Sequence, residues 1–158
     1  MKTWFSRSAW MPALLAALVL TFASGCKPEG CTDANADNFD PDAQVDDGSC
    51  VLAREKFIAT YNVNEACPSG NFTYSITITA SSTGTNGVIV SNFGNFGQPV
   101  NGTVNGSSIS IPSQTVTASG VAVTVNGTGS INGTILTINY QYNFAGGGES
   151  CTMNCSKL

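Results

Sequence analysis

Alternating apolar and polar side chains dominate the chain after residue 56. In the segment 72–79, Phe, Tyr and Ile alternate with Thr and Ser, and in the segment 136–142, Leu, Ile and Tyr alternate with Thr, Asn and Gln. A period of two places the apolar side chains on one face of a β-strand. Each strand then has one apolar face and one face toward water, which is typical of antiparallel sheets.

Turn residues divide this pattern into short strands. Asn-Gly dipeptides begin at Asn86, Asn101, Asn105, Asn126 and Asn132, and we expect each to supply the pair of positive φ angles that a two-residue hairpin needs. The predicted strands are 57–63, 71–80, 87–92, 100–104, 107–111, 114–118, 121–126, 128–131, 134–143 and 150–155. Because the connections are short, the sequence predicts an all-β antiparallel meander that closes into a small barrel and leaves no free edge.

An internal echo supports consecutive hairpins of one design. Asn101-Gly-Thr leading to Asn105-Gly recurs as Asn126-Gly-Thr leading to Asn132-Gly, and each second dipeptide precedes an Ile-rich alternating segment. A solenoid needs at least three repeats, so the two copies favour a barrel over a β-helix.

The N-terminus has the layout of an export signal. Lys2 and Arg7 precede the apolar run 11–22, which small residues follow. This run is shorter than the roughly 20 residues that span a membrane. The ending Ala23-Ser24-Gly25-Cys26 resembles the bacterial lipobox, with alanine at a position where leucine is common. The resemblance implies that the signal peptide 1–25 is removed and that a lipid on Cys26 attaches the protein to a membrane. Ordinary cleavage would instead leave Cys26 as one more disulfide cysteine.

Charge separates two modules in the exported part. All ten acidic residues follow Cys26, and six aspartates lie between Cys31 and Cys50 without a basic residue. From Val51 onward the composition turns to Thr, Ser, Asn, Gly and β-branched residues. We therefore predict a lipidated tether over 26–30, an acidic module over 31–50 and the barrel domain over 54–158. The acidic balance argues against binding to nucleic acid, which needs a basic surface.

The acidic module is too short to bury a core. A Cys31–Cys50 disulfide would close it, and calcium, which prefers oxygen ligands, is a possible cofactor. The candidate calcium ligands, at short alternating spacings, are Asp33, Asn35, Asp37, Asp40 and Asp42. The loop departs from the EF-hand pattern, because Asn38 replaces the turn glycine and Gln44 the bidentate glutamate. A metal-free loop of Asx turns remains the alternative.

The same stretch resembles a cysteine-framed module, GCTDxxAxNYxPxAxxDDGSC, of surface and secreted proteins of Bacteroidetes and marine bacteria. The matching residues are Gly30-Cys31-Thr32-Asp33, Ala36, Asn38, Pro41, Ala43 and Asp46-Asp47-Gly48-Ser49-Cys50, with Phe39 in place of the tyrosine. The resemblance implies an envelope-exposed protein with a short extracellular spacer, and the module has no agreed activity. Together with the lipobox it leads us to expect a lipoprotein of the outer membrane. Lys27-Pro28-Glu29 only partly resembles the surface-export signal of such lipoproteins, so the periplasmic and cell-surface faces both stay open.

The second module resembles the small lipocalin-like domains of Bacteroidetes lipoproteins, over 57–61, 111–115, 129–131 and 136–140. Membership implies a compact meander barrel, sometimes with an internal ligand cavity. A barrel of about eight strands is either filled by its side chains or holds one small molecule. The candidate ligand-lining residues are Phe72, Tyr74, Tyr140 and Tyr142, and plain core packing is the alternative for all four.

Closure of a barrel would also pair cysteines. If the last strand runs antiparallel beside the first, Cys151 is the better partner for Cys67, and Cys155 is left over opposite the start of strand 57–63. A Cys67–Cys155 bridge, a Cys151–Cys155 bridge and an intermolecular bond remain open, because five cysteines cannot all pair internally.

Catalysis has little support in the composition. The chain has no histidine, which excludes His-based triads and His-ligated metal sites. The carboxylates outside the acidic module are Glu55, Glu65 and Glu149, and a glycosidase-like pair of Glu65 and Glu149 requires that the barrel bring their loops together. We therefore expect no enzyme. The two function classes are a binding module for a small molecule, glycan or protein, and a structural or adhesive surface protein with a packed barrel.

Overall fold

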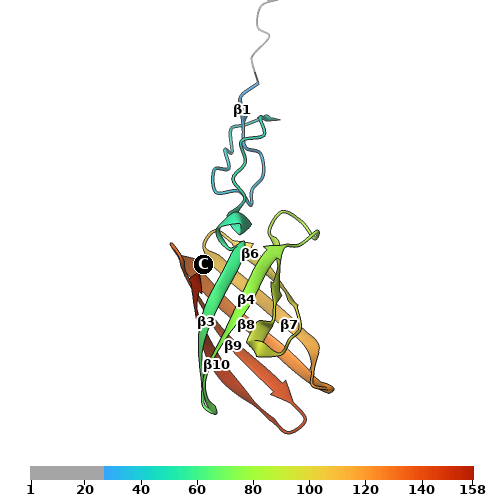
Figure 1. Cartoon of the computed structure of the whole chain (residues 1–158). Helices are drawn as coiled ribbons and strands as arrows, with labels where there is room; N and C mark the ends of the chain where they lie inside the picture. Colours follow the sequence, from blue (N-terminus) through green and yellow to red (C-terminus); the bar gives the residue numbers. More distant parts are fainter. Residues whose placement is uncertain (1–26) are drawn as a thin grey trace, which may run out of the picture.

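The computed structural model describes residues 27–158, so the predicted signal peptide 1–25 and the lipid-bearing Cys26 lie outside the described residues. Two units follow one another along the described chain, a small loop-rich module and a barrel (Figure 1). Within this range, no helix has the length and apolar character needed to cross a membrane.

The predicted all-β antiparallel barrel is confirmed. Eight strands form a closed sheet in which each strand pairs with its neighbour in sequence and β10 returns to β3. The strands are β3 (Ala59–Cys67), β4 (Gly70–Ala80), β5 (Gly87–Ser91), β6 (Val100–Asn105), β7 (Ser108–Ala118), β8 (Val121–Asn132), β9 (Ile135–Phe144) and β10 (Gly147–Lys157). Closure leaves the barrel itself without an edge strand that could pair with another chain.

Several predicted strands merge. The segments 107–111 and 114–118 form the single strand β7, with a register shift between Ile111 and Gln114. The Gln114 side chain bridges this irregularity by accepting a hydrogen bond from the Asn101 N–H (2.9 Å) and donating one to the Asn101 carbonyl (2.8 Å). The segments 121–126 and 128–131 likewise join into β8. The predicted breaks were wrong because a bulge and a pairing side chain let the ladder continue.

The Asn-Gly dipeptides do not form the two-residue turns that the sequence predicted. Asn105 and Asn132 are the last paired residues of their strands, and only the following Gly106 and Gly133 have positive φ, at 57° and 58°. Glycine in the first loop position is typical of a type II′ hairpin. The dipeptides at 101 and 126 lie inside strands. At Gly127 a Cβ would lie 2.7 Å from the Cβ of Tyr140, so close packing and not a turn requires this glycine.

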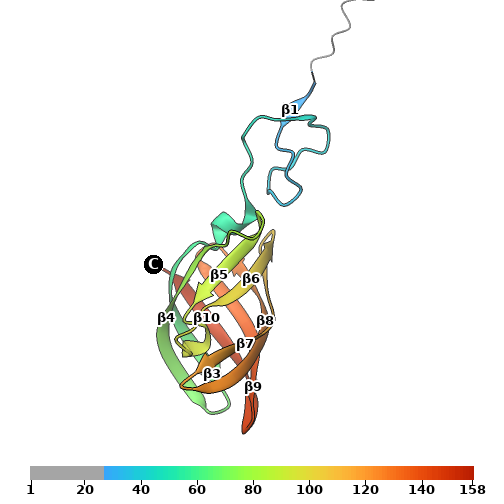
Figure 2. The same cartoon turned by 90° about the vertical axis from the view of Figure 1, so that its right-hand side faces the viewer.

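The interior of the barrel is packed with apolar side chains. They form one cluster of buried Ile, Val, Leu, Phe, Tyr and Met residues that all strands of the barrel supply. A short 3₁₀ helix, η2 (Ala53–Lys56), and the fully buried Phe57 close one end (Figure 2). The hydroxyl of Tyr61 donates a hydrogen bond to the Phe57 carbonyl at 2.9 Å, which fixes this plug to the wall.

The outer wall of the barrel is polar but uncharged. The charged residues in its strands are Glu65, Glu149 and Lys157. All three occupy the same alternate positions as the inward-facing residues of their strands, so none lies on the outward face. The outward positions carry Thr, Ser, Asn and Gln, which pair across strands, as in Thr60 with Thr77 at 3.2 Å. Charge is therefore confined to the two ends of the barrel.

The acidic module lies beyond the closed end. A parallel pair, β1 (Glu29–Gly30) and β2 (Val45–Asp46), and the disulfide Cys31–Cys50 hold it together. Lys56 of η2 forms an ion pair with Asp37 (Nζ to Oδ2, 2.7 Å), which joins the module to the barrel. The open end of the barrel therefore faces away from the module (Figure 1).

The second disulfide lies where barrel closure was predicted to place it. Cys67 and Cys151, 84 residues apart in sequence, are bonded to each other at the open end. Cys155 is a free, fully buried thiol whose backbone pairs with Val63, in the middle of β3 and not at its start. The difference arises because β3 begins and ends later than the predicted strand 57–63.

We predict that the Cys67→Ser, Cys151→Ser double variant lowers the free energy of unfolding by about 4 kcal/mol, because the disulfide closes a long loop in the unfolded chain. Chemical denaturation under non-reducing conditions measures this change. The matched control is the Cys31→Ser, Cys50→Ser variant, which should leave the barrel transition in place. Equal effects of both pairs on that transition would contradict the assignment of closure to Cys67–Cys151.

Candidate functional site

A cavity of about 190 Å³ opens at the end of the barrel opposite η2. Its walls come from β3, β4, β9 and the loop between β5 and β6. The lining residues are Glu65, Cys67, Ser69, Phe72, Gly94, Asn95, Phe96, Tyr140 and Tyr142. We call this cavity the mouth cavity.

Glu65 is the buried polar side chain of this site. It is 4% exposed although it carries a carboxylate. Its Oε1 atom accepts two hydrogen bonds, one from the Tyr140 hydroxyl at 2.6 Å and one from the Tyr74 hydroxyl at 2.9 Å. No hydrogen bond from the described residues reaches Oε2, so this oxygen is left for a ligand or solvent in the mouth cavity.

Both tyrosines are held in their protonated form. Burial raises the pKa of Tyr140 far above its usual value, and the hydrogen bond to Glu65 and the charge of Glu65 raise it further. Burial and then the charge of Glu65 likewise raise the pKa of Tyr74. The two hydroxyls therefore act as fixed donors that orient the carboxylate.

Two aromatic pairs pack at this end of the barrel. Phe93 meets Tyr140 edge to face with ring centroids 4.8 Å apart, and Phe96 meets Tyr142 in the same way at 5.5 Å. Both phenylalanines belong to the short turn around η3 (Phe93–Asn95). Gly94 has a φ of 60°, and a Cβ there would lie 2.9 Å from the Tyr140 hydroxyl oxygen. The glycine thus allows this turn to approach the site closely.

The predicted ligand-lining residues gather at this end. Phe72, Tyr140 and Tyr142 line the mouth cavity, with Phe72 at the rim and 43% exposed. Tyr74 does not line it but supports it through the hydrogen bond to Glu65. The sequence prediction missed Phe96, which has no alternating pattern around it, and missed the role of Glu65.

The sequence contains a pattern that could have identified Glu65 as a buried site residue. It continues the inward register of Tyr61 and Val63, so it is an acidic residue at an apolar position of a strand. Ending the predicted strand at residue 63 placed Glu65 in a loop and hid this pattern. A charged residue in the inward register is the feature that points to a buried polar site.

Glu149 lies at the same end of the barrel but takes a different position. Its Oε2 accepts a hydrogen bond at 2.8 Å from the hydroxyl of Ser69, which lines the mouth cavity, so Glu149 lies at the rim of that cavity and also borders a second hollow beside Gln141 and Asn143. A glycosidase pair must flank one bond within one site. Closure of the barrel thus brings Glu65 and Glu149 to one end, where Glu65 is buried between two tyrosine hydroxyls and Glu149 lies at the rim, and a catalytic pair stays a hypothesis.

The two ends of the barrel differ in charge. Of the basic residues that the structure describes, Arg54 and Lys56 belong to η2, and Lys157 donates a hydrogen bond to the Lys56 carbonyl at 3.2 Å. These three lie at the closed end, and the fourth, Lys27, precedes β1 in the module beyond that end, while Glu65 and Glu149 lie at the open end. The mouth cavity consequently has a negative potential that no neighbouring basic side chain among the described residues offsets.

A metal at the mouth does not fit the chemistry of the donors. Ligand atoms of Glu65, Cys67 and Cys151 lie within 4.8 Å of one another. The two sulfurs are bonded to each other in the disulfide, however, and metals bind the thiolate form of cysteine. One carboxylate alone is left, which is too few ligands for a protein metal site.

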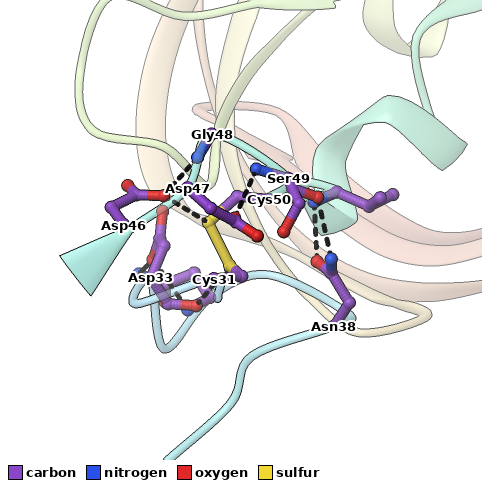
Figure 3. The surroundings of a disulfide bond; sticks show 10 residues. Cys31, Asp33, Asn38, Asp46, Asp47, Gly48, Ser49 and Cys50 are labelled. Atoms are coloured by element: carbon purple, nitrogen blue, oxygen red, sulfur yellow. Dashed lines mark hydrogen bonds between the residues drawn. A yellow bond between two sulfur atoms is a disulfide. The ribbon is translucent and has the colours of Figure 1, made fainter. Parts of the chain in front are cut away.

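The five candidate calcium ligands of the acidic module are not gathered into one site. Asp33 accepts hydrogen bonds from the backbone and side chain of Asn35, Asp40 accepts one from the Asp42 N–H, and Asp37 pairs with Lys56. Figure 3 shows the same kind of turn on the other side of the Cys31–Cys50 disulfide, where Asp46 and Asp47 bind the following backbone. Most of these carboxylates therefore accept hydrogen bonds within Asx turns, and Asp37 pairs with Lys56. Calcium binding stays a prediction, and this arrangement adds no support to it.

Two larger hollows lie on the outer wall, with volumes of about 680 and 610 Å³. They are lined mainly by Ser, Thr, Asn and Gly of β6 to β10, and no charged residue lines either one. Both lack the buried polar group of the mouth cavity. The smaller mouth cavity is therefore the stronger candidate for a binding site.

We predict that Glu65→Ala lowers the free energy of unfolding by about 2 kcal/mol, because it leaves the buried hydroxyls of Tyr74 and Tyr140 without an acceptor. Glu65→Gln should cost less, since an amide oxygen still accepts from them. Thermal or urea unfolding measures both. Glu55→Ala, which removes an exposed carboxylate at the closed end, is the control and should change little; a Glu65→Ala variant as stable as wild type would refute the arrangement.

Alkaline pH should destabilise the barrel through its tyrosines. Burial raises the pKa of Tyr61 to about 12, and the pKa values of Tyr74 and Tyr140 are raised as well. Because the folded values lie above the value of about 10 for unfolded tyrosine, the stabilisation is complete below about pH 10 and is lost as pH rises through the folded values. Tyrosinate absorbance should rise at higher pH in the native protein than in the urea-unfolded protein. Superimposable titration curves would show that the tyrosines are not buried as described.

Comparisons with known proteins identify no family. No family model matches the chain, and no solved structure matches it. A segment of 24 residues is 71% identical to ribulose bisphosphate carboxylase/oxygenase activase A of Hordeum vulgare and, at the same identity, to the activase of Arabidopsis thaliana. The segment covers 15% of this chain and 5% of each activase. Likeness over so small a share of either protein assigns neither a family nor an activity.

Proposed function

We propose that this protein is a lipid-anchored protein of the bacterial cell envelope whose barrel binds a small molecule in the mouth cavity without catalysis. The observation that carries the binding proposal is Glu65, a carboxylate that is 4% exposed and lines a cavity of about 190 Å³. Burying a charged group costs free energy unless partners compensate for it. A carboxylate kept at such a position indicates a role beyond packing.

The support for the anchor is separate and comes from the N-terminus. The lipobox-like ending at Cys26 and the cysteine-framed module after it both suggest attachment to the outer membrane, with either face exposed. The residues that line the mouth cavity lie at one end of the barrel, and the acidic module lies beyond the opposite end (Figure 2). A tether at the N-terminal side would leave the cavity accessible to molecules around the membrane.

A structural or adhesive role is the second candidate, and one observation favours it. Most of the barrel interior is filled by apolar side chains, and the outer wall is an uncharged surface of hydroxyl and amide groups. Such a body needs no ligand. It gives no reason, however, for placing a carboxylate and two tyrosine hydroxyls in the interior.

Native mass spectrometry of the protein, produced from the full chain in a Gram-negative host and extracted in mild detergent, tests both parts of the proposal. We expect an N-terminus at a lipid-modified Cys26 and, in addition to this mass, a retained small molecule. A ligand-free mass would support the structural alternative, and an unmodified N-terminus would contradict the anchor.

A pair of tryptophan variants locates the retained molecule. Ser69 lines the mouth cavity and is exposed, so Ser69→Trp should cover the opening and remove the bound molecule. Ser82→Trp makes the same change in an exposed loop outside the mouth and should retain it. Retention by both variants would place the molecule elsewhere.

A further inference from the structure

We infer that the mouth cavity is a site for a small organic cation, such as a molecule with an alkylated ammonium group. This inference rests on the proposed binding function and names the chemical class of its ligand. It follows from three features of the cavity: the buried carboxylate, the aromatic walls and the absence of a basic side chain among the described residues of this end.

The carboxylate provides the anchoring charge. Both tyrosine hydroxyls bind Oε1 of Glu65, so they fix the side chain while Oε2 receives no hydrogen bond from the described residues. A neutral apolar ligand would exclude water from this oxygen without providing a hydrogen bond or a charge to replace it, which costs free energy. An anion would be repelled by Glu65 and by Glu149, which lies close enough to raise the pKa of Tyr142 after the larger effect of burial.

The aromatic walls suit an organic cation and not a hydrated metal ion. Phe72, Phe96, Tyr140 and Tyr142 all line the cavity, and aromatic rings attract cations through the negative charge of their faces. Alkylated ammonium groups combine a positive charge with an apolar surface, so they fit rings and carboxylate together. Calcium and magnesium require several oxygen ligands, which the cavity does not supply.

The volume limits the ligand to a small molecule. The cavity has a volume of about 190 Å³. This is enough for a trimethylammonium group with a short tail, which would extend through the open rim beside Phe72. A polymer or a long lipid chain does not fit inside, because the interior below the cavity is packed.

Isothermal titration calorimetry with a matched pair of probes tests the inference on the full-chain lipoprotein in detergent. Choline carries a quaternary nitrogen, and 3,3-dimethylbutan-1-ol has the same shape with a neutral carbon in its place. We expect choline to bind at least ten-fold more tightly than the alcohol. In Glu65→Gln this preference should disappear, whereas Glu55→Gln, which removes the same charge from the closed end, should keep it.

The outcomes separate this inference from the proposed binding function. Equal binding of both probes, or tighter binding of the alcohol, would overturn the cation assignment and leave a binding cavity in place. If neither probe binds, the cation assignment is also overturned. A retained molecule in the native mass spectrum would then still support the binding function, whereas a ligand-free mass would contradict the binding function as well. Because the wild-type comparison of the two probes decides the assignment, it does not depend on the folding of the Glu65→Gln variant.

Discussion

Pairing of β10 with β3 is the contact on which the site depends. It closes the sheet and brings the two ends of the domain's sequence together, so that Glu65 of β3 lies beside Met153 of β10 and within reach of Tyr140 of β9. The Cys67–Cys151 disulfide fastens this seam at the open end. Glu65 and Tyr140 are 75 residues apart in the sequence, and closure of the barrel brings them within hydrogen-bond distance. Without closure, the carboxylate would lose the shorter of its two hydrogen bonds.

The closed barrel is polarised along its axis. η2 plugs one end and carries basic residues that hold the acidic module, as in the Lys56–Asp37 pair. The other end carries the carboxylates, the aromatic rings and the mouth cavity. Between them lies a packed interior inside a neutral wall. This division explains how a domain with few charges presents one attractive end to a ligand and the other to its tether.

The sequence predicted the fold well where local patterns decide it. Period-two alternation and short connections were enough for a closed antiparallel meander, and closure in turn favoured Cys151 over Cys155 as the partner of Cys67 without excluding the other pairings. Strand continuity was harder, because Gly127 looks like a turn residue and is instead a point of close packing against Tyr140. Local composition does not distinguish these two uses of glycine.

The site was only partly predictable for a related reason. The aromatic residues of β4 and β9 were identified by their alternation, but Glu65 was lost when strand β3 was ended too early. Phe96 owes its position to the positive φ angles of Asn92, Gly94 and Asn95, which turn the chain over the barrel mouth. Such a contact depends on tertiary structure, and no periodic pattern in the sequence indicates it.

The central claim is that two buried tyrosine hydroxyls hold the Glu65 carboxylate at the barrel mouth. Proton NMR of the tyrosine hydroxyl groups tests it directly. The account predicts two downfield hydroxyl signals, from Tyr74 and Tyr140, that exchange slowly with water and both shift in Glu65→Gln. Hydroxyl signals lost to rapid exchange, or signals that do not respond to Glu65→Gln, would contradict it.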